Sequence, residues 1–108
     1  MKRIEFVGDS LERIRRFPES PRKEAGVQLH KVQLGLEPSD WKPMAAVGSG
    51  AREIRVQDEA GAFRVMYVAH IAGAIYVLHA FQKKTQQTPL RDIELAAKRL
   101  KQLLKDKS

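Results

Sequence analysis

The chain has 108 residues, of which 43% are hydrophobic, and this fits one domain, residues 1–108, with a modest core. Its 20 Lys and Arg residues against 13 Asp and Glu residues give a net charge of +7, which attracts nucleic acid phosphates, anionic membranes or acidic proteins. The lack of cysteine excludes a disulfide framework, a thiol nucleophile and a cysteine metal site. No apolar run approaches the length that crosses a bilayer, so we expect a cytoplasmic protein with no membrane partner.

The first part of the chain predicts one strand followed by two helices. Residues 4–7 are apolar enough for a short strand, and Asp9 or Ser10 is a suitable N-cap for a helix that reaches about Arg16. Pro21 opens a second helix, in which apolar residues recur at spacings of four, three and four and form one stripe. The stripe consists of Ala25, Leu29, Val32 and Leu36.

The second part predicts three strands and a last helix. Residues 37–50 have no clear period and are expected to form a loop. Strands are expected over residues 52–56, 62–71 and 75–82, and the short turns between them favour an antiparallel meander. The last helix has its apolar face at Ile93, Ala96, Ala97, Leu100, Leu103 and Leu104. The predicted fold class is α+β, a small antiparallel sheet in the order strand-helix-helix-strand-strand-strand-helix, with helices on one face and the other face open.

Four cations lie on or just after the three consecutive predicted strands. Lys83 and Lys84 directly follow an apolar run, and two adjacent ammonium groups repel each other unless a polyanion lies beside them. Arg55 and Arg64 lie on the two preceding strands, so in a meander all four side chains can converge on one patch. Arginine binds phosphate through its planar fork and lysine acts as a point charge, which indicates a phosphate site.

The two arginines differ in how easily an internal ion pair could explain them. Arg55 can form a cross-strand pair with Glu53 or Asp58, and this alternative stays open. The nearest sequence neighbours of Arg64 include no carboxylate, so we weight Arg64 above Arg55. We expect Arg64 and the two lysines to face solvent.

Other candidate residues have two interpretations each. His79 alternates with Phe81 on one strand face, so it is either a packed residue or one that contacts a base or transfers a proton. Phe81 fits the core, or stacking on a nucleobase. The basic face of the last helix, with Lys98, is either solvated or in contact with an RNA backbone. The three histidines have no ligand spacing, so neither a metal site nor a cofactor is expected.

Several short motifs carry a family resemblance. They are Trp41-Lys42-Pro43, Gly48-Ser49-Gly50 followed by Arg52-Glu53-Ile54-Arg55, Phe63-Arg64-Val65-Met66-Tyr67, the block from His79 to Pro89, and Ile93-Glu94-Leu95-Ala96-Ala97. The most specific is Phe81-x-Lys83-Lys84-Thr85 followed by Thr88-Pro89. With these motifs the chain resembles the RelE/ParE toxin superfamily, in the HigB-like, phage-derived branch of type II toxin–antitoxin systems.

The resemblance implies a RelE-like fold and an mRNA interferase, an endoribonuclease that cleaves mRNA without a metal, typically on the ribosome. It also implies a helix-turn-helix antitoxin (HigA-like) as partner. Arg55, Arg64, Lys83 and Lys84 match the family's basic positions and are the expected catalytic residues. The expected RNA contacts are Lys42, Arg52, His79, Phe81 and Lys98.

The C-terminal tail departs from the superfamily pattern. Many members carry a C-terminal histidine or tyrosine for the chemistry, whereas the tail after Leu104 is Lys-Asp-Lys-Ser. The general base would then be a lysine or His79. Two other functions remain open, a ParE-like toxin that inhibits DNA gyrase and an RNA-binding domain without catalysis.

Overall fold

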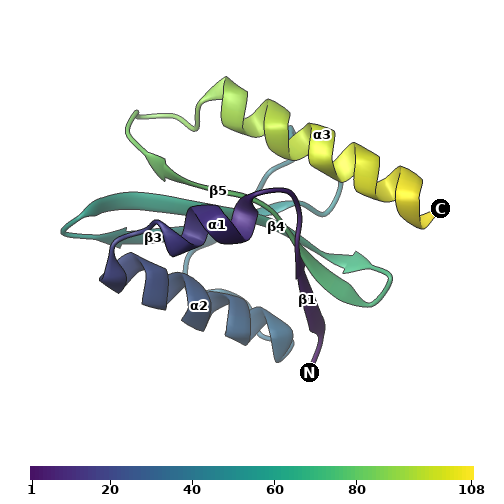
Figure 1. The fold of residues 1–108 in the computed structure, drawn as a ribbon, viewed down its shortest axis with the longest axis horizontal. Coiled ribbons are helices and arrows are strands. Elements are labelled where there is room, and N and C mark those ends of the chain that lie inside the picture. Colours follow the sequence, from purple (N-terminus) through teal and green to yellow (C-terminus); the bar gives the residue numbers. More distant parts are fainter.

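A five-stranded sheet forms the centre of the structure, a computed structural model that describes all 108 residues (Figure 1). In chain order the elements are β1 (Arg3–Phe6), α1 (Ser10–Arg15), α2 (Glu19–Gln33), β2 (Trp41–Pro43), β3 (Arg52–Asp58), β4 (Gly61–Ile71), β5 (Ala74–Lys83) and α3 (Leu90–Lys107). The α+β class is confirmed, and the predicted helices and strands are present in the predicted order, with β2 as an additional strand. None of the three helices is both long enough and apolar enough to cross a membrane.

The strand order is β1-β5-β4-β3-β2, and the sheet is mixed rather than wholly antiparallel. Strands β3, β4 and β5 form the predicted meander, but β1 pairs with β5 in parallel, with Ile4 opposite Ile75. The long helical connection after β1 allows this parallel pairing, which a short turn cannot make. Strand β2 pairs with β3 inside the expected loop, with Trp41 opposite Ile54. Three residues that end on a proline have too little periodicity to be recognised as a strand.

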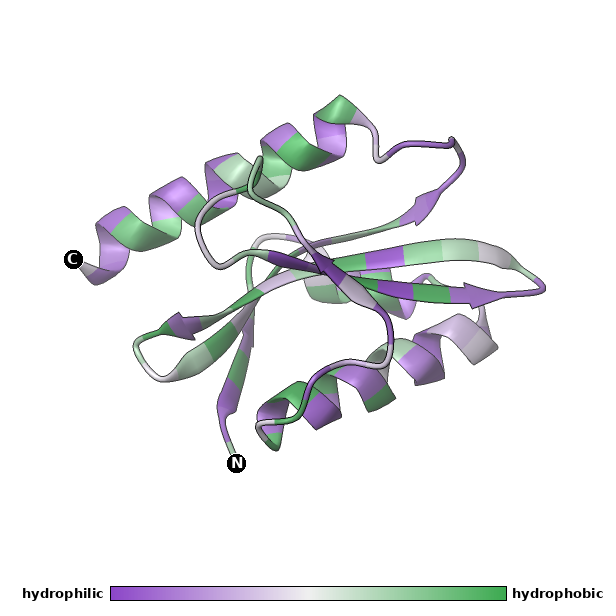
Figure 2. Ribbon diagram, turned by 180° about the vertical axis from the view of Figure 1, so that it is seen from behind, coloured by the Kyte–Doolittle hydropathy of each residue, from purple (hydrophilic) through white to green (hydrophobic).

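Helices cover both faces of the sheet, which corrects the expectation of one open face. Helices α1 and α2 pack on one face, where Leu29 joins a core cluster with Ile54 and Val65. Helix α3 packs on the other face, where Leu100 joins a second cluster with Met66. In Figure 2 hydrophobic residues recur along both helix layers and along the strands between them. The apolar stripe of α3 needs a surface to pack against, and the second sheet face provides it.

The ends of the helices decide which apolar residues are buried. Helix α2 ends at Gln33, and Gly35 follows with a φ of +82°, a conformation that favours glycine. Leu36 was predicted to extend the buried stripe, but it lies beyond the helix and is 55% exposed. On α3, Leu104 was assigned to the apolar face and is 48% exposed, because it lies about 100° around the helix from the buried Leu103.

A β-bulge in β5 sets the direction of the side chains that follow it. Met66 lies opposite His79, but Tyr67 lies opposite Val77, so Leu78 is an additional residue on β5. Such a bulge shifts the alternation of side chains by one. Leu78 therefore joins the core beneath α3, and the adjacent His79 also points to the α3 side, where it contacts Asp92 of that helix. By alternation, Phe81 and Lys83 face the same side as His79.

Candidate active site

Five charged residues lie on the α3 side of the sheet, beyond the apolar core: Lys42 of β2, Glu53 and Arg55 of β3, Arg64 of β4 and Lys83 of β5. We call these five residues the charged cluster. The strand register places them together, because Lys42 lies opposite Glu53, Arg55 lies opposite Arg64, and Lys83 lies opposite Ala62, two residues before Arg64. Four positive charges and one negative charge leave the cluster with a net charge of +3.

A buried ion pair forms the base of the cluster. The Nε atom of Arg64 lies 3.5 Å from Oε1 of Glu53, and the two side chains are 6% and 0% exposed. Thr88 donates a hydrogen bond of 3.1 Å to the other carboxylate oxygen, and Arg64 donates one of 2.9 Å to the carbonyl of Phe63. Burial lowers the pKa of Arg64, and the charge of Glu53 opposes that effect. The charge of Glu53 and the hydrogen bond to Phe63 together retain the Arg64 guanidinium in the base of the cluster, although Arg64 Nε and Glu53 Oε1 make no hydrogen bond.

This pair corrects two expectations about Arg64. The side chain is buried rather than solvent-facing, and it does have a carboxylate partner, which comes from the neighbouring strand and not from its own sequence neighbours. The sequence of β3 did indicate this carboxylate partner, because Glu53 and Arg55 are two residues apart and so share one face of the strand. Since Arg55 lies opposite Arg64, its face is also the face of Arg64.

Arg55 and Lys83 are the accessible members of the cluster near this pair. Neither expected partner of Arg55 lies within ion-pair distance, and its one ion pair is with Asp40, at 4.0 Å. Burial is the first cause that lowers the pKa of Lys83, and the charge of Arg64 is the second. Lys42 and Arg55 lower it further, while Glu53 raises it. A lysine with a lowered pKa gives up its proton more readily than a free lysine does.

Lys84 does not join the charged cluster. It lines a separate cavity beside His79 and Phe81, between α1 and the beginning of α3. The side chains of the two adjacent lysines therefore lie in two different sites, whereas the sequence predicted that both would lie in one site. The physical reason is the end of the strand, because Lys83 is the last residue of β5 and keeps the face of Arg64, whereas Lys84 begins the loop that leads to α3.

His79 and Phe81 are packed residues in this structure. They are 0% and 5% exposed, and their rings stack with centroids 5.1 Å apart. The Nε2 atom of His79 lies 2.7 Å from Oδ1 of Asp92, an acidic neighbour that the sequence spacing did not reveal. Burial lowers the pKa of His79, although Asp92 favours the charged form. Neither ring is placed to stack on a nucleobase without rearrangement. No three His, Asp or Glu side chains come together as a possible metal site.

Arg52 and Lys98 lie apart from the cluster. The guanidinium carbon of Arg52 lies 4.0 Å from the centroid of the Trp41 ring, and Arg52 also forms an ion pair of 2.8 Å with Glu37. Alternation along β3 directs Arg52 to the face opposite to that of Glu53. Lys98 is exposed on α3 and makes no ion pair. Of the nine residues predicted for the site, the structure thus brings together Lys42, Arg55, Arg64 and Lys83.

The comparison with protein families gives one match. Residues 12–101 match the family described as phage derived protein Gp49-like (DUF891). No curated protein sequence matches the chain. The Gp49-like family is generally a family of toxins from toxin–antitoxin systems and falls within the RelE-like toxin superfamily, so an antitoxin partner is implied. Because the match spans most of the 108 residues, this chain belongs to the Gp49-like family of phage-derived proteins.

Proposed function

We propose that this protein is the endoribonuclease toxin of a type II toxin–antitoxin system, of the HigB-like branch, and that it cleaves mRNA on the ribosome. The observation that carries the proposal is the charged cluster, in which cations from β2, β3, β4 and β5 surround one carboxylate. Its net positive charge matches a phosphodiester, and the lowered pKa of Lys83 suits a group that moves a proton.

The reaction needs attack by a ribose 2′-oxygen on the adjacent phosphorus, with departure of the 5′-oxygen. The 2′-hydroxyl loses a proton, the 5′-oxygen gains one, and the products carry a 2′,3′-cyclic phosphate and a 5′-hydroxyl. Arg55 and Lys83, the accessible cations, contact the phosphate and stabilise the charge that develops on its oxygens. Lys83, in its neutral form, accepts the proton of the 2′-hydroxyl, and the ammonium so formed gives a proton to the departing 5′-oxygen. Arg64 lies beneath them, held by Glu53, and adds positive potential without direct exposure.

An antitoxin would neutralise this activity by covering the same cations. The family implies an antitoxin, and we propose that it is a helix-turn-helix protein of the HigA type. An acidic segment placed over Arg55 and Lys83 would replace the phosphate that these side chains bind. Such masking would block RNA without any change in the fold.

The proposal is tested by RNA cleavage with the purified protein and a Lys83→Ala variant. The wild type should cleave mRNA, with ribosomes present, in the presence of EDTA and leave 2′,3′-cyclic or 3′-phosphate ends. Lys83→Ala should lower the rate by about a hundred- to a thousandfold, the usual effect of removing a group that stabilises transition-state charge. Its fold should be retained, because the side chain is not buried.

Lys101→Ala is the matched control, since Lys101 is exposed on α3, is not a member of the charged cluster and makes no ion pair. It should cleave like the wild type. Cleavage by Lys83→Ala at the wild-type rate would refute the assignment of the site. If expression of the protein stopped DNA supercoiling and left cellular mRNA intact, the protein would be a gyrase inhibitor instead.

A further inference from the structure

We propose that a second cavity, beside the end of β5, binds a phosphate group of the RNA backbone and forms a subsite distinct from the charged cluster. The cavity has a volume of about 520 Å³ and lies between α1, β5 and the beginning of α3. The identification of RNA as the source of the phosphate rests on the proposed function. The phosphate site itself rests on the side chains that line the cavity.

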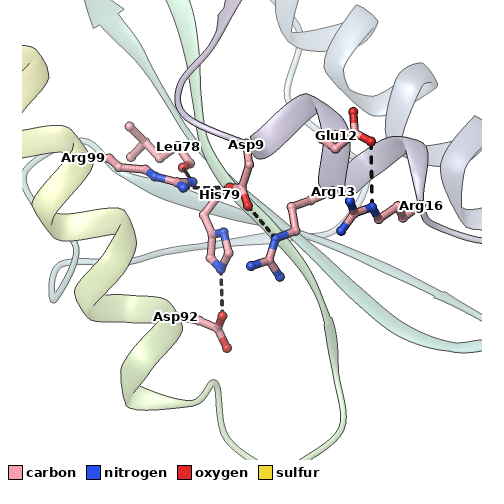
Figure 3. A network of polar contacts seen from close by, with 8 residues as sticks. All are labelled: Asp9, Glu12, Arg13, Arg16, Leu78, His79, Asp92 and Arg99. Carbon is pink, nitrogen blue, oxygen red and sulfur yellow. Dashed lines mark hydrogen bonds and ion pairs between the residues drawn. The ribbon is translucent and has the colours of Figure 1, made fainter.

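Three cations from three different elements line this cavity: Arg13 of α1, Lys84 just after β5, and Arg91 of α3. Arg13 uses its Nε atom for a 2.9 Å contact with Asp9, which leaves both of its terminal nitrogens free for another ligand (Figure 3). Lys84 and Arg91 make no ion pair within the chain. The one carboxylate that lines the cavity, Asp92, is already bound to His79. The cavity therefore has an excess of positive charge with donors that have no acceptor.

A buried imidazole nitrogen in the wall of the cavity also has no partner. The side chain of His79 is 1% exposed, its Nε2 atom contacts Asp92, and its Nδ1 atom makes no hydrogen bond. Figure 3 shows the ring between the Asp92 carboxylate and the Arg13 side chain. The charges that face it are those of Asp92, Arg13 and Arg99. A bound phosphate would favour the imidazolium form of His79. In that form Nδ1–H is a hydrogen-bond donor, like the side chains of Arg13, Arg91 and Lys84.

The position of Lys84 connects this cavity with the charged cluster. Lys83 and Lys84 are consecutive, so their Cα atoms are about 3.8 Å apart. One points to the cluster and the other to the cavity. One RNA strand can therefore place successive phosphates in the charged cluster and in the cavity. Two arginines favour phosphate over a single carboxylate ligand, because each planar guanidinium can bind two oxygens of the same group.

Histidine NMR tests this inference on the intact protein. The chain has only three histidines, and His30 and His70 are both exposed and outside the cavity. Titration with a nucleoside 3′,5′-bisphosphate should shift the ring resonances of His79 in a saturable way and leave those of the other two unchanged. The double variant Lys84→Gln, Arg91→Gln should bind at least about tenfold more weakly, because two charge-assisted hydrogen bonds are lost.

The control variant Arg15→Gln, Arg22→Gln removes the same charge from exposed positions of α1 and α2 that do not line the cavity, and it should bind like the wild type. Unchanged His79 resonances, or full affinity in the Lys84→Gln, Arg91→Gln variant, would overturn the inference. A Glu-rich peptide that shifts His79 at lower concentration than the bisphosphate would also overturn it, in favour of a protein partner. Failure here leaves the Lys83→Ala cleavage test unaffected, and a His79 response without any RNA cleavage would reject only the proposed function.

Discussion

Replacement of Glu53 by glutamine should destabilise the fold strongly, although the change removes no volume. Glu53 is 0% exposed, and its carboxylate is the nearest counter-charge of Arg64, which is 5% exposed. Glutamine can still accept the hydrogen bond from Thr88. What Glu53→Gln removes is the negative charge, so Arg64 would remain buried beside the other cations of the charged cluster with no anion within ion-pair distance.

The magnitude follows from the distance between the two side chains. Two unit charges 3.5 Å apart, the separation of Arg64 Nε and Glu53 Oε1, attract each other by about 5 kcal/mol at an effective dielectric constant of about 20. Loss of one partner from a buried ion pair usually costs about 3–5 kcal/mol. We therefore expect the free energy of unfolding to fall by about 3–5 kcal/mol.

Urea denaturation, followed by circular dichroism, measures this change. Glu53→Gln should lower the midpoint with an unchanged slope. Glu59→Gln is the control, because Glu59 is exposed in the turn between β3 and β4 and makes no ion pair, so its effect should be within about 0.5 kcal/mol. Adding Arg64→Met to Glu53→Gln should restore part of the loss, since the uncompensated charge is then absent. A loss below about 1 kcal/mol for Glu53→Gln would show that Arg64 is solvated and that the pair is not the base of the site.

Two further predictions concern stability. Leu100→Ala should lower the free energy of unfolding by about 2–5 kcal/mol through lost burial and a residual cavity, whereas Leu104→Ala, exposed on the same helix, should have little effect in the same urea assay. The pKa of Asp9 is lowered from 3.8 to about 2, chiefly by Arg13 and then by Arg99, so its stabilisation is complete above about pH 5 and is lost as the pH falls towards 2. Because the Asp9 side chain is 46% exposed, Asp9→Asn should cost only about 1 kcal/mol at pH 7, and urea midpoints measured between pH 7 and 2 should depend less on pH in the variant.

The parts of the fold that local patterns specify were predictable, and those that depend on long-range pairing were not. The spacing of Ala96, Leu100 and Leu103 identified the buried face of α3, because helical periodicity is a local property. The parallel pairing of β1 with β5 joins residues about 70 positions apart, such as Ile4 and Ile75, and no local pattern encodes it. The second helix layer was missed for the same reason, since all the helices, α3 included, were expected on one face of the sheet.

The residues of the site divide in the same way, into those that local patterns place and those that long-range contacts place. That Arg55, Arg64 and Lys83 come together follows from the meander, which short turns made predictable. The contact between His79 and Asp92 depends on the extra residue at Leu78, and a β-bulge inside an apolar run leaves no mark in the hydrophobic pattern. Burial of Arg64 was missed because its partner is on another strand, where the shared face of Glu53 and Arg55 was the only sign of it.

A buried carboxylate in a cationic site changes which residues can be expected to act on RNA. Arg64 cannot lose its hydration without a counter-charge, and Glu53 provides that charge at the cost of one positive charge in the site. The charge that remains available to a ligand therefore belongs to Arg55, Lys83 and Lys42, which are partly exposed. Loss of activity on replacement of Arg64 would be ambiguous between chemistry and folding, whereas loss on replacement of Lys83 would not. For this reason Lys83, rather than the arginine that the sequence favoured, is the residue whose substitution decides the function.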